Sequence, residues 1–160
     1  MRRLALLLLV VTFGWIAPGL AKDVEAQNKA VARSFFEDVL DKGKLEDYAK
    51  SHAPGFIAHS EGSQASLEED MTAAREQRKA LPDMRVKVNH IVAEGDLVSV
   101  YWTASGTNTA AGWGIPATGR SVSVSGMTLF RFERGLIHEE WSVFNMYSIL
   151  KQLGLLPPPA

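Results

Sequence analysis

The sequence contains no cysteine among its 160 residues. Disulfide bonds, a thiol nucleophile and a lipid anchor on cysteine are therefore excluded. The four histidines (His52, His59, His90 and His138) lack the i, i+4 spacing of a helical zinc site. No metal site is expected from this spacing.

Two further motifs of enzymes are missing. No Gly-x-Ser-x-Gly nucleophile elbow is present. The segment "GWGIPATG" (112–119) superficially resembles a phosphate loop, but it lies between two expected strands and not before a helix. Neither a nucleophile elbow nor a phosphate-binding loop is therefore expected.

The sequence also lacks an excess of positive charge, since its formal net charge is −1. Nucleic-acid-binding domains usually carry a basic patch, and surface-bound helices a basic amphipathic stretch. Neither nucleic acid nor a membrane surface is expected as a partner.

The only long apolar run lies at the N-terminus. Arg2 and Arg3 precede 13 mostly apolar residues (Leu4 to Ile16), and small residues end at Ala21. This pattern is typical of a secretory signal peptide, whereas a membrane span needs about 20 apolar residues. We expect residues 1–21 to be a signal peptide, residues 22–160 one domain, and the protein secreted or periplasmic. An uncleaved membrane anchor is the alternative.

Helical patterns fill the first half of this domain. A helix is expected from Asp23 to about Lys42, followed by a short helix (45–52) and a short strand (56–60). Ser66 and Glu69 form a capping box that predicts the start of a third helix, which ends at 81–83.

The second half alternates in hydrophobicity with the period of strands. Four strands are expected over 84–94, 97–105, 120–133 and 136–145, and a helical turn over 146–153. A change of apolar parity near Gly126 predicts a β-bulge there. The order predicts an α+β fold, in which helices pack on a bent antiparallel sheet, a cone-shaped barrel with an internal pocket.

The loop over 105–119 places Trp113 among glycines and small residues. Trp113 and Asn108 are expected either at the rim of a small-molecule pocket or, in the alternative, as a plug at the end of the cone. Tyr101 and Trp102 alternate, so only one of them faces the pocket.

In the last strand, alternation places Ile137, Glu139, Trp141, Val143 and Asn145 on one face. Desolvation there would raise the pKa of Glu139 and suit it to proton transfer. The alternative is a solvated Glu139 without a role, and Glu140 is expected on the outer face. His59 is expected to point into the cone or to be a structural residue.

Five stretches carry a family resemblance: "AHS" (58–60), "LPDMRVKV" (81–88), "VAEGDLVSVYW" (92–102), "SGTNTAAGWGIPATGRSVSVSG" (105–126) and "GLIHEEWSVFNMYSILKQLG" (135–154). From His59 to Leu156, the chain resembles the SnoaL-like polyketide cyclases, or ester cyclases, which have a cystatin-like cone fold. The resemblance implies a cofactor-free site that closes a ring by intramolecular aldol condensation, with a pocket carboxylate as acid–base.

Two positions depart from that family. Asn108 stands where the family usually has histidine, and Asn145 where it usually has an aspartate before Gln-Leu-Gly. Neither amide titrates near neutral pH. Two functions therefore remain open: a cyclase-like enzyme, and a non-catalytic envelope protein that binds a small hydrophobic molecule.

The enzyme hypothesis assigns three catalytic residues, His59, Glu139 and Asn145. Four residues are expected to bind substrate: Tyr101, Asn108, Trp113 and Trp141. Under either hypothesis the partner is a small apolar or polyketide-like molecule, and the exposed sheet face is expected to form a homodimer.

Overall fold

The computed structural model describes residues 18–60 and 62–156, so most of the predicted signal segment lies outside the described residues. None of the helices in these two ranges is both long and apolar enough to cross a membrane. The elements are α1 (Pro18–Ser34), η1 (Phe35–Asp41), η2 (Leu45–Ser51), β1 (His52–Ser60), β2 (Ser63–Ser66), α2 (Leu67–Ala80), β3 (Arg85–Glu94), β4 (Leu97–Thr107), β5 (Ser121–Glu133), β6 (Leu136–Phe144) and α3 (Met146–Leu153).

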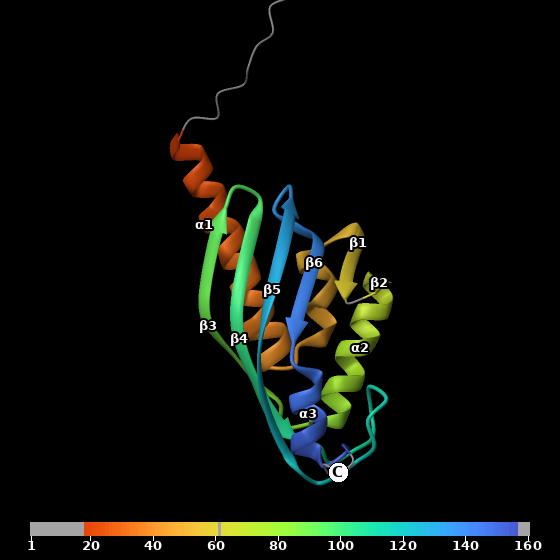
Figure 1. Cartoon of the computed structure of the whole chain (residues 1–160). Coiled ribbons are helices and arrows are strands. Elements are labelled where there is room, and N and C mark those ends of the chain that lie inside the picture. Colours follow the sequence, from red (N-terminus) through yellow and green to blue (C-terminus); the bar gives the residue numbers. More distant parts are fainter. Residues whose placement is uncertain (1–17, 61, 157–160) are drawn as a thin grey trace, which may run out of the picture.

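The strands form one bent sheet in the order β2-β1-β6-β5-β4-β3, and α1, η1 and α2 cover one of its faces (Figure 1). The predicted α+β fold is confirmed. An antiparallel sheet was predicted, but the observed sheet is mixed, because β1 runs parallel to β6. The sheet is also not closed into a barrel.

The core lies between the sheet and the helices that cover it. Phe35 and Phe36 of η1 pack against Phe130 of β5 at ring-centroid distances of 6.1 and 6.0 Å. Val98, Val100, Phe130 and Ile137 are completely buried. These side chains fix which side of each strand faces inward.

Gly126 does not form the predicted bulge. The pairing of β4 with β5 runs without a break from Leu97 opposite Arg131 to Thr107 opposite Ser121. Even-numbered residues of β5 face the core throughout, so Met127 points outward. A Cβ at position 126 would lie 2.4 Å from Cζ2 of Trp102, so the glycine makes room for the indole ring.

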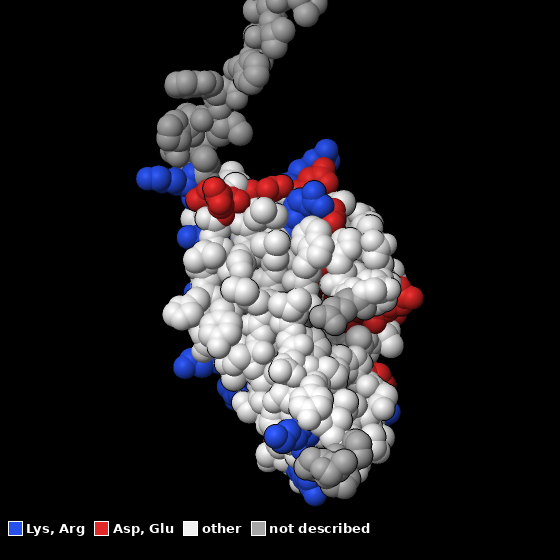
Figure 2. All heavy atoms as spheres, in the orientation of Figure 1, with Lys and Arg blue, Asp and Glu red and all other residues white. Residues whose placement is uncertain are grey.

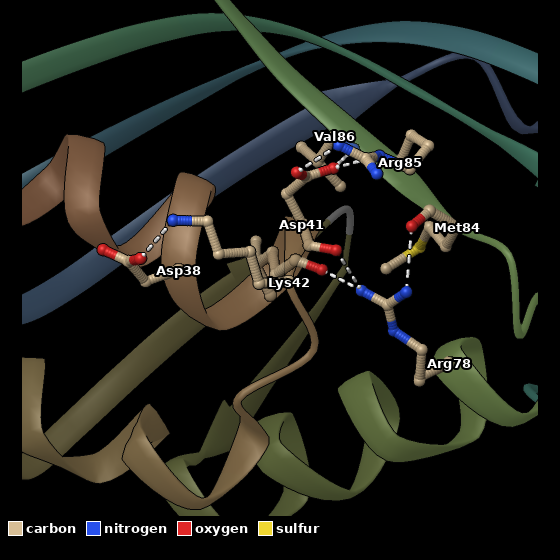
Figure 3. A network of polar contacts seen from close by, with 8 residues as sticks. Asp38, Asp41, Lys42, Arg78, Met84, Arg85 and Val86 are labelled. Carbon is tan, nitrogen blue, oxygen red and sulfur yellow. Dashed lines mark hydrogen bonds and ion pairs between the residues drawn. The ribbon is translucent and has the colours of Figure 1, made fainter.

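Arg78 of α2 joins three segments of backbone (Figure 3). Its guanidinium donates to the carbonyl oxygens of Leu40 and Asp41, where η1 ends, and to that of Met84 at 2.9 Å. The Asp41 carboxylate in turn accepts hydrogen bonds from Arg85 and from the backbone N–H of Val86, the latter at 2.7 Å. These bonds hold η1, α2 and the start of β3 in one arrangement.

The outer face of the sheet carries exposed apolar side chains. Val92, Tyr101, Met127 and Val143 are exposed there by 63, 39, 50 and 56%. Figure 2 shows few charged residues across the middle of this face. The structure contains one chain, so the expected homodimer stays a prediction.

Candidate functional site

A cavity of about 300 Å³ lies between the inner face of the sheet and the helices. Most of its wall is apolar, with contributions from Phe35, Phe36, Ala74, Val86 and Phe144. Its polar side chains include Tyr48, Asp70, Thr128, Glu140 and Ser142. A mostly apolar cavity with a few convergent polar groups is typical of a small-molecule site.

Glu140 reaches this cavity because β6 contains a bulge. Ile137 lies opposite Phe132 and Glu139 opposite Arg131, so His138 between them has no partner on β5. The extra residue shifts the alternation by one position, and Glu140 lies opposite the buried Phe130. The prediction that Glu139 shares the inner face with Ile137, and that Glu140 faces outward, was therefore wrong.

A chain of three hydrogen bonds ends on Glu140. Trp102 Nε1 donates to Thr128 Oγ1 at 3.0 Å, Thr128 Oγ1 lies 2.7 Å from Ser142 Oγ, and Ser142 donates to Glu140 Oε1 at 2.7 Å. Since the Ser142 proton is directed at Glu140, the Thr128 hydroxyl donates to Ser142. Every donor of the chain points toward Glu140, which fixes this oxygen as an acceptor.

Asp70 of α2 faces the same cavity from the helical side. The hydroxyl of Tyr48 in η2 donates to Asp70 Oδ2 at 2.5 Å. Tyr48 is itself buried and stacks on His52 at a centroid distance of 4.9 Å. Asp70 and Glu140 are thus the two carboxyl groups inside the cavity, each held by a hydroxyl donor, whereas Glu69, which also lines it, is exposed and caps α2.

Burial controls the protonation of this pair. Desolvation, followed by repulsion from Asp70, raises the pKa of Glu140 to about 8, although the Ser142 hydrogen bond acts in the opposite direction. Desolvation also raises the pKa of Asp70. Burial and the two nearby carboxylates raise the pKa of Tyr48, so its hydroxyl keeps its proton. A carboxyl group with the pKa of Glu140 can exchange protons near neutral pH.

The structure brings His59, Glu139 and Trp141 together on the outer side of the sheet. His59 contributes to the cavity wall, but its ring stacks on Trp141 at 4.8 Å and its Nε2 lies 2.9 Å from Glu139 Oε2. Glu139 is also paired with Arg131, and the hydrogen bond from Arg131 is the main cause that lowers the pKa of Glu139. A carboxylate in this state is a weak base.

Asn108 and Asn145, two of the predicted site residues, use their side chains to bond nearby backbone groups. Asn108 is 2% exposed, and its amide donates to the carbonyl of Ala110 and accepts from the N–H and hydroxyl of Thr118. Asn145 is exposed and caps α3 by accepting from the N–H of Ser148 at 2.9 Å. Asn108 lines a smaller neighbouring cavity, whereas Asn145 lines neither cavity.

The two aromatic residues of the predicted site differ in position. Trp113 lines the cavity, and its ring centroid lies 5.8 Å from that of Phe144. Tyr101 is on the outer face beside His90, and Trp102 is the member of that pair which faces inward. Within residues 18–60 and 62–156, no group of three histidine, aspartate or glutamate side chains is placed to hold a metal ion.

Sequence reasoning missed Glu140, Asp70, Tyr48, Thr128 and Ser142. Glu140 was missed because the inward–outward alternation of β6 was assumed to continue through His138, where the strand has a bulge. Asp70 and Tyr48 lie in segments that were predicted only as helices, without a role for their polar side chains. Thr128 and Ser142 carried one usable signal, since each is a hydroxyl at an inward position of an apolar strand.

The raised pKa of Glu140 predicts how stability depends on pH. This carboxyl ionises near its ordinary pKa of 4.5 in the unfolded chain but near 8 in the folded protein, so the unfolded state binds fewer protons between these values. The free energy of unfolding should therefore fall as pH rises from about 5 to 8, by up to about 1.4 kcal/mol per pH unit for this group. Urea unfolding at pH 5.5, 6.5 and 7.5 measures the slope.

Glu140→Gln should flatten this slope. Glu139→Gln is the matched control and should keep the wild-type slope, because its lowered pKa places its contribution at acid pH. Equal slopes for wild type and Glu140→Gln would show that Glu140 titrates normally.

Comparison with known proteins identifies the family of the chain. The family model of SnoaL-like polyketide cyclases matches residues 30–153. No match was found among curated proteins.

Several solved structures are similar. AclR from Streptomyces galilaeus, a proposed hydroxylase, is 29% identical, with 85% of this chain and 86% of that chain covered and a TM-score of 0.77. IdmH from Streptomyces antibioticus, a proposed polyketide cyclase, is 27% identical, with coverages of 80% and 99% and a TM-score of 0.69. A proposed SnoaL-like polyketide cyclase from Jannaschia sp. CCS1 is 22% identical, with coverages of 91% and 99% and a TM-score of 0.75, and shows the fold alone. Because the family model covers most of the chain, this protein belongs to the SnoaL-like polyketide cyclase family.

Proposed function

We propose that this protein is a cofactor-independent enzyme that moves a proton next to a carbonyl group, as in an intramolecular aldol cyclisation. The observation that carries the proposal is the Asp70 and Glu140 pair in one mostly apolar cavity. Membership of a cyclase family supports the same class of reaction. The substrate is a small molecule with an acidic C–H bond between or beside carbonyl groups.

Glu140 is the base in this proposal. Its ionised carboxylate takes a proton from the substrate carbon, and the electron pair of the broken C–H bond moves onto the carbonyl oxygen to form an enolate. Ser142, Thr128 and Trp102 fix one carboxylate oxygen, which leaves the other free to accept the proton. A pKa near 8 makes Glu140 a stronger base than an ordinary carboxylate.

Asp70 supplies a hydrogen-bond donor on the opposite side. Because desolvation raises the pKa of Asp70, its protonated carboxyl can donate from one oxygen to the enolate oxygen, while the Tyr48 hydroxyl, which keeps its proton, holds the other oxygen. The enolate carbon then bonds to a second carbonyl carbon of the same molecule, and the new alkoxide takes the proton held by Glu140. The sequence of steps neither consumes nor produces electrons, so it needs no redox partner.

Removing the base tests this mechanism. Glu140→Gln should reduce proton exchange at C2 of a β-keto ester in D₂O by about 10²- to 10⁴-fold, the usual contribution of general acid–base catalysis. Ser142→Ala should reduce it less, because the carboxylate stays but loses its fixed orientation. Proton NMR measures the exchange, with ring closure of an ester-bearing polyketide model compound as the second assay.

Two variants separate this mechanism from its alternatives. Glu139→Gln should stay near wild type, because Glu139 is paired on the outer face. Asn145→Asp should also change little; a clear gain in rate would instead favour the acid–base role that the family resemblance implies for an aspartate at position 145. Binding without exchange in every variant would identify a non-catalytic binding protein.

We further propose that the protein is exported and acts outside the cytoplasm. The support is the N-terminal sequence pattern alone, with Arg2 and Arg3, the apolar run and Ala21. N-terminal sequencing of the protein from the envelope fraction should begin at or within a few residues of Lys22. Recovery of the full-length chain in the cytoplasm would contradict export.

A further inference from the structure

A second cavity adjoins the one that contains the carboxyl pair. It has a volume of about 100 Å³ and lies between the end of α2, the loop after β4, and α3. Its wall includes Leu81, Val122, Val124, Ile149 and Leu153. Its polar members are Gln77, Ser105 and Asn108, and the Asn108 amide is already bonded within the loop. A ligand group that fits here is a hydrocarbon.

The two cavities are compartments on either side of one wall. Six residues line both of them: Gln77, Met84, Trp102, Ala104, Trp113 and Phe144. The Phe144 ring lies 6.2 Å from that of Trp102 and 5.8 Å from that of Trp113, so an aromatic row forms much of the wall. A ligand that fills both cavities must pass along this row.

Trp102 is the fixed member of the row. Its indole N–H is bonded to Thr128, and its ring occupies the space left by Gly126. Moving this ring would break the hydrogen-bond chain to Glu140.

Trp113 is held differently. It has a φ of 52° and precedes Gly114, which has a φ of 71°. Gly112 and Ile115 exchange two backbone hydrogen bonds around them, at 3.1 and 2.9 Å, so the pair forms a two-residue hairpin turn. A positive φ is unfavourable for a large side chain. Within the described ranges its indole N–H has no hydrogen-bond partner, so the ring can shift without breaking such a bond.

We propose that the substrate has two parts: an enolisable carbonyl group beside Glu140, and one alkyl arm that extends past Trp113 into the second cavity. The position of the carbonyl group rests on the proposed function, whereas the arm rests on the second cavity. An apolar cavity of about 150 Å³ binds benzene. The smaller volume here therefore suits an unbranched arm of about four to five carbon atoms.

A series of methyl 3-oxoalkanoates tests the arm. Their arms run from one to eight carbons, and the dissociation constant of each is measured by NMR titration. Glu140→Gln is used as well as wild type, so that binding is measured without turnover. Affinity should rise about fourfold for each added methylene up to about five carbons, since each buried methylene contributes a similar increment. Longer arms should gain nothing further.

Two variants change the second cavity in opposite directions. Val124→Phe fills it and should weaken binding of the five-carbon arm at least tenfold while leaving the one-carbon arm unchanged. Trp113→Ala opens the wall, so affinity should continue to rise beyond five carbons. Val92→Phe is the control: like Val124→Phe it replaces a valine with phenylalanine, but on the outer face. It should leave the affinity for every member of the series unchanged. Circular dichroism confirms the fold of each variant.

The results separate this inference from the proposed function. Affinity independent of arm length, or a plateau that neither Val124→Phe nor Trp113→Ala moves, would overturn the two-part substrate. Exchange at C2 that depends on Glu140 would then still support the proposed function. A plateau that moves as predicted, without any exchange, would uphold the alkyl compartment and overturn the catalytic role of Glu140.

Discussion

One unpaired residue in β6 determines the chemistry of the cavity. Because His138 has no partner on β5, Glu140 and not Glu139 lies opposite Phe130 and faces the helices. The same shift sends Glu139 outward to Arg131 and His59. Two adjacent glutamates therefore differ in pKa by their environment alone: pairing with Arg131 lowers the pKa of one, and burial raises that of the other.

Burying two carboxyl groups in one cavity is unfavourable for the folded state. Neither Asp70 nor Glu140 has a cationic partner among the hydrogen bonds and ion pairs of the described ranges; each is held by a neutral hydroxyl. This arrangement compensates little of the desolvation of a charged carboxylate, so protonation is favoured. The aromatic core around Phe35 and Phe130 supplies stabilisation that offsets this cost.

The sequence predicted features that depend on neighbouring residues. The capping box of Ser66 and Glu69 opens α2 as predicted, and the turns at Gly95-Asp96 and Arg134-Gly135 join the expected hairpins. The first helix was expected from Asp23 but begins at Pro18. The strand at 56–60 begins earlier, at His52, which pairs with Ile137 of β6. Pro54 and Gly55 lie in the register shift between His52 and Ile57, where this pairing is interrupted.

Features set by distant contacts were not predictable in this way. The parity change at Gly126 was read as a bulge, but the glycine is required by the Trp102 ring on the neighbouring strand. The bulge at His138 leaves no such mark in the sequence, because outward Trp141 and Val143 look as apolar as a core face. Because these residues lie on the outer face of the sheet, apolar alternation does not mark the inner face of β6.

Direct titration of Glu140 tests the central claim, that a carboxyl group in the cavity retains its proton to neutral pH. Protein labelled with ¹³C at glutamate side-chain carboxyls is titrated from pH 4 to 9 by NMR, and Glu140→Gln assigns the signal. We expect one glutamate signal to titrate near pH 8 and to be absent in the variant. If every glutamate of the wild type titrates below about pH 5.5, the cavity does not hold a proton-transfer group of this kind.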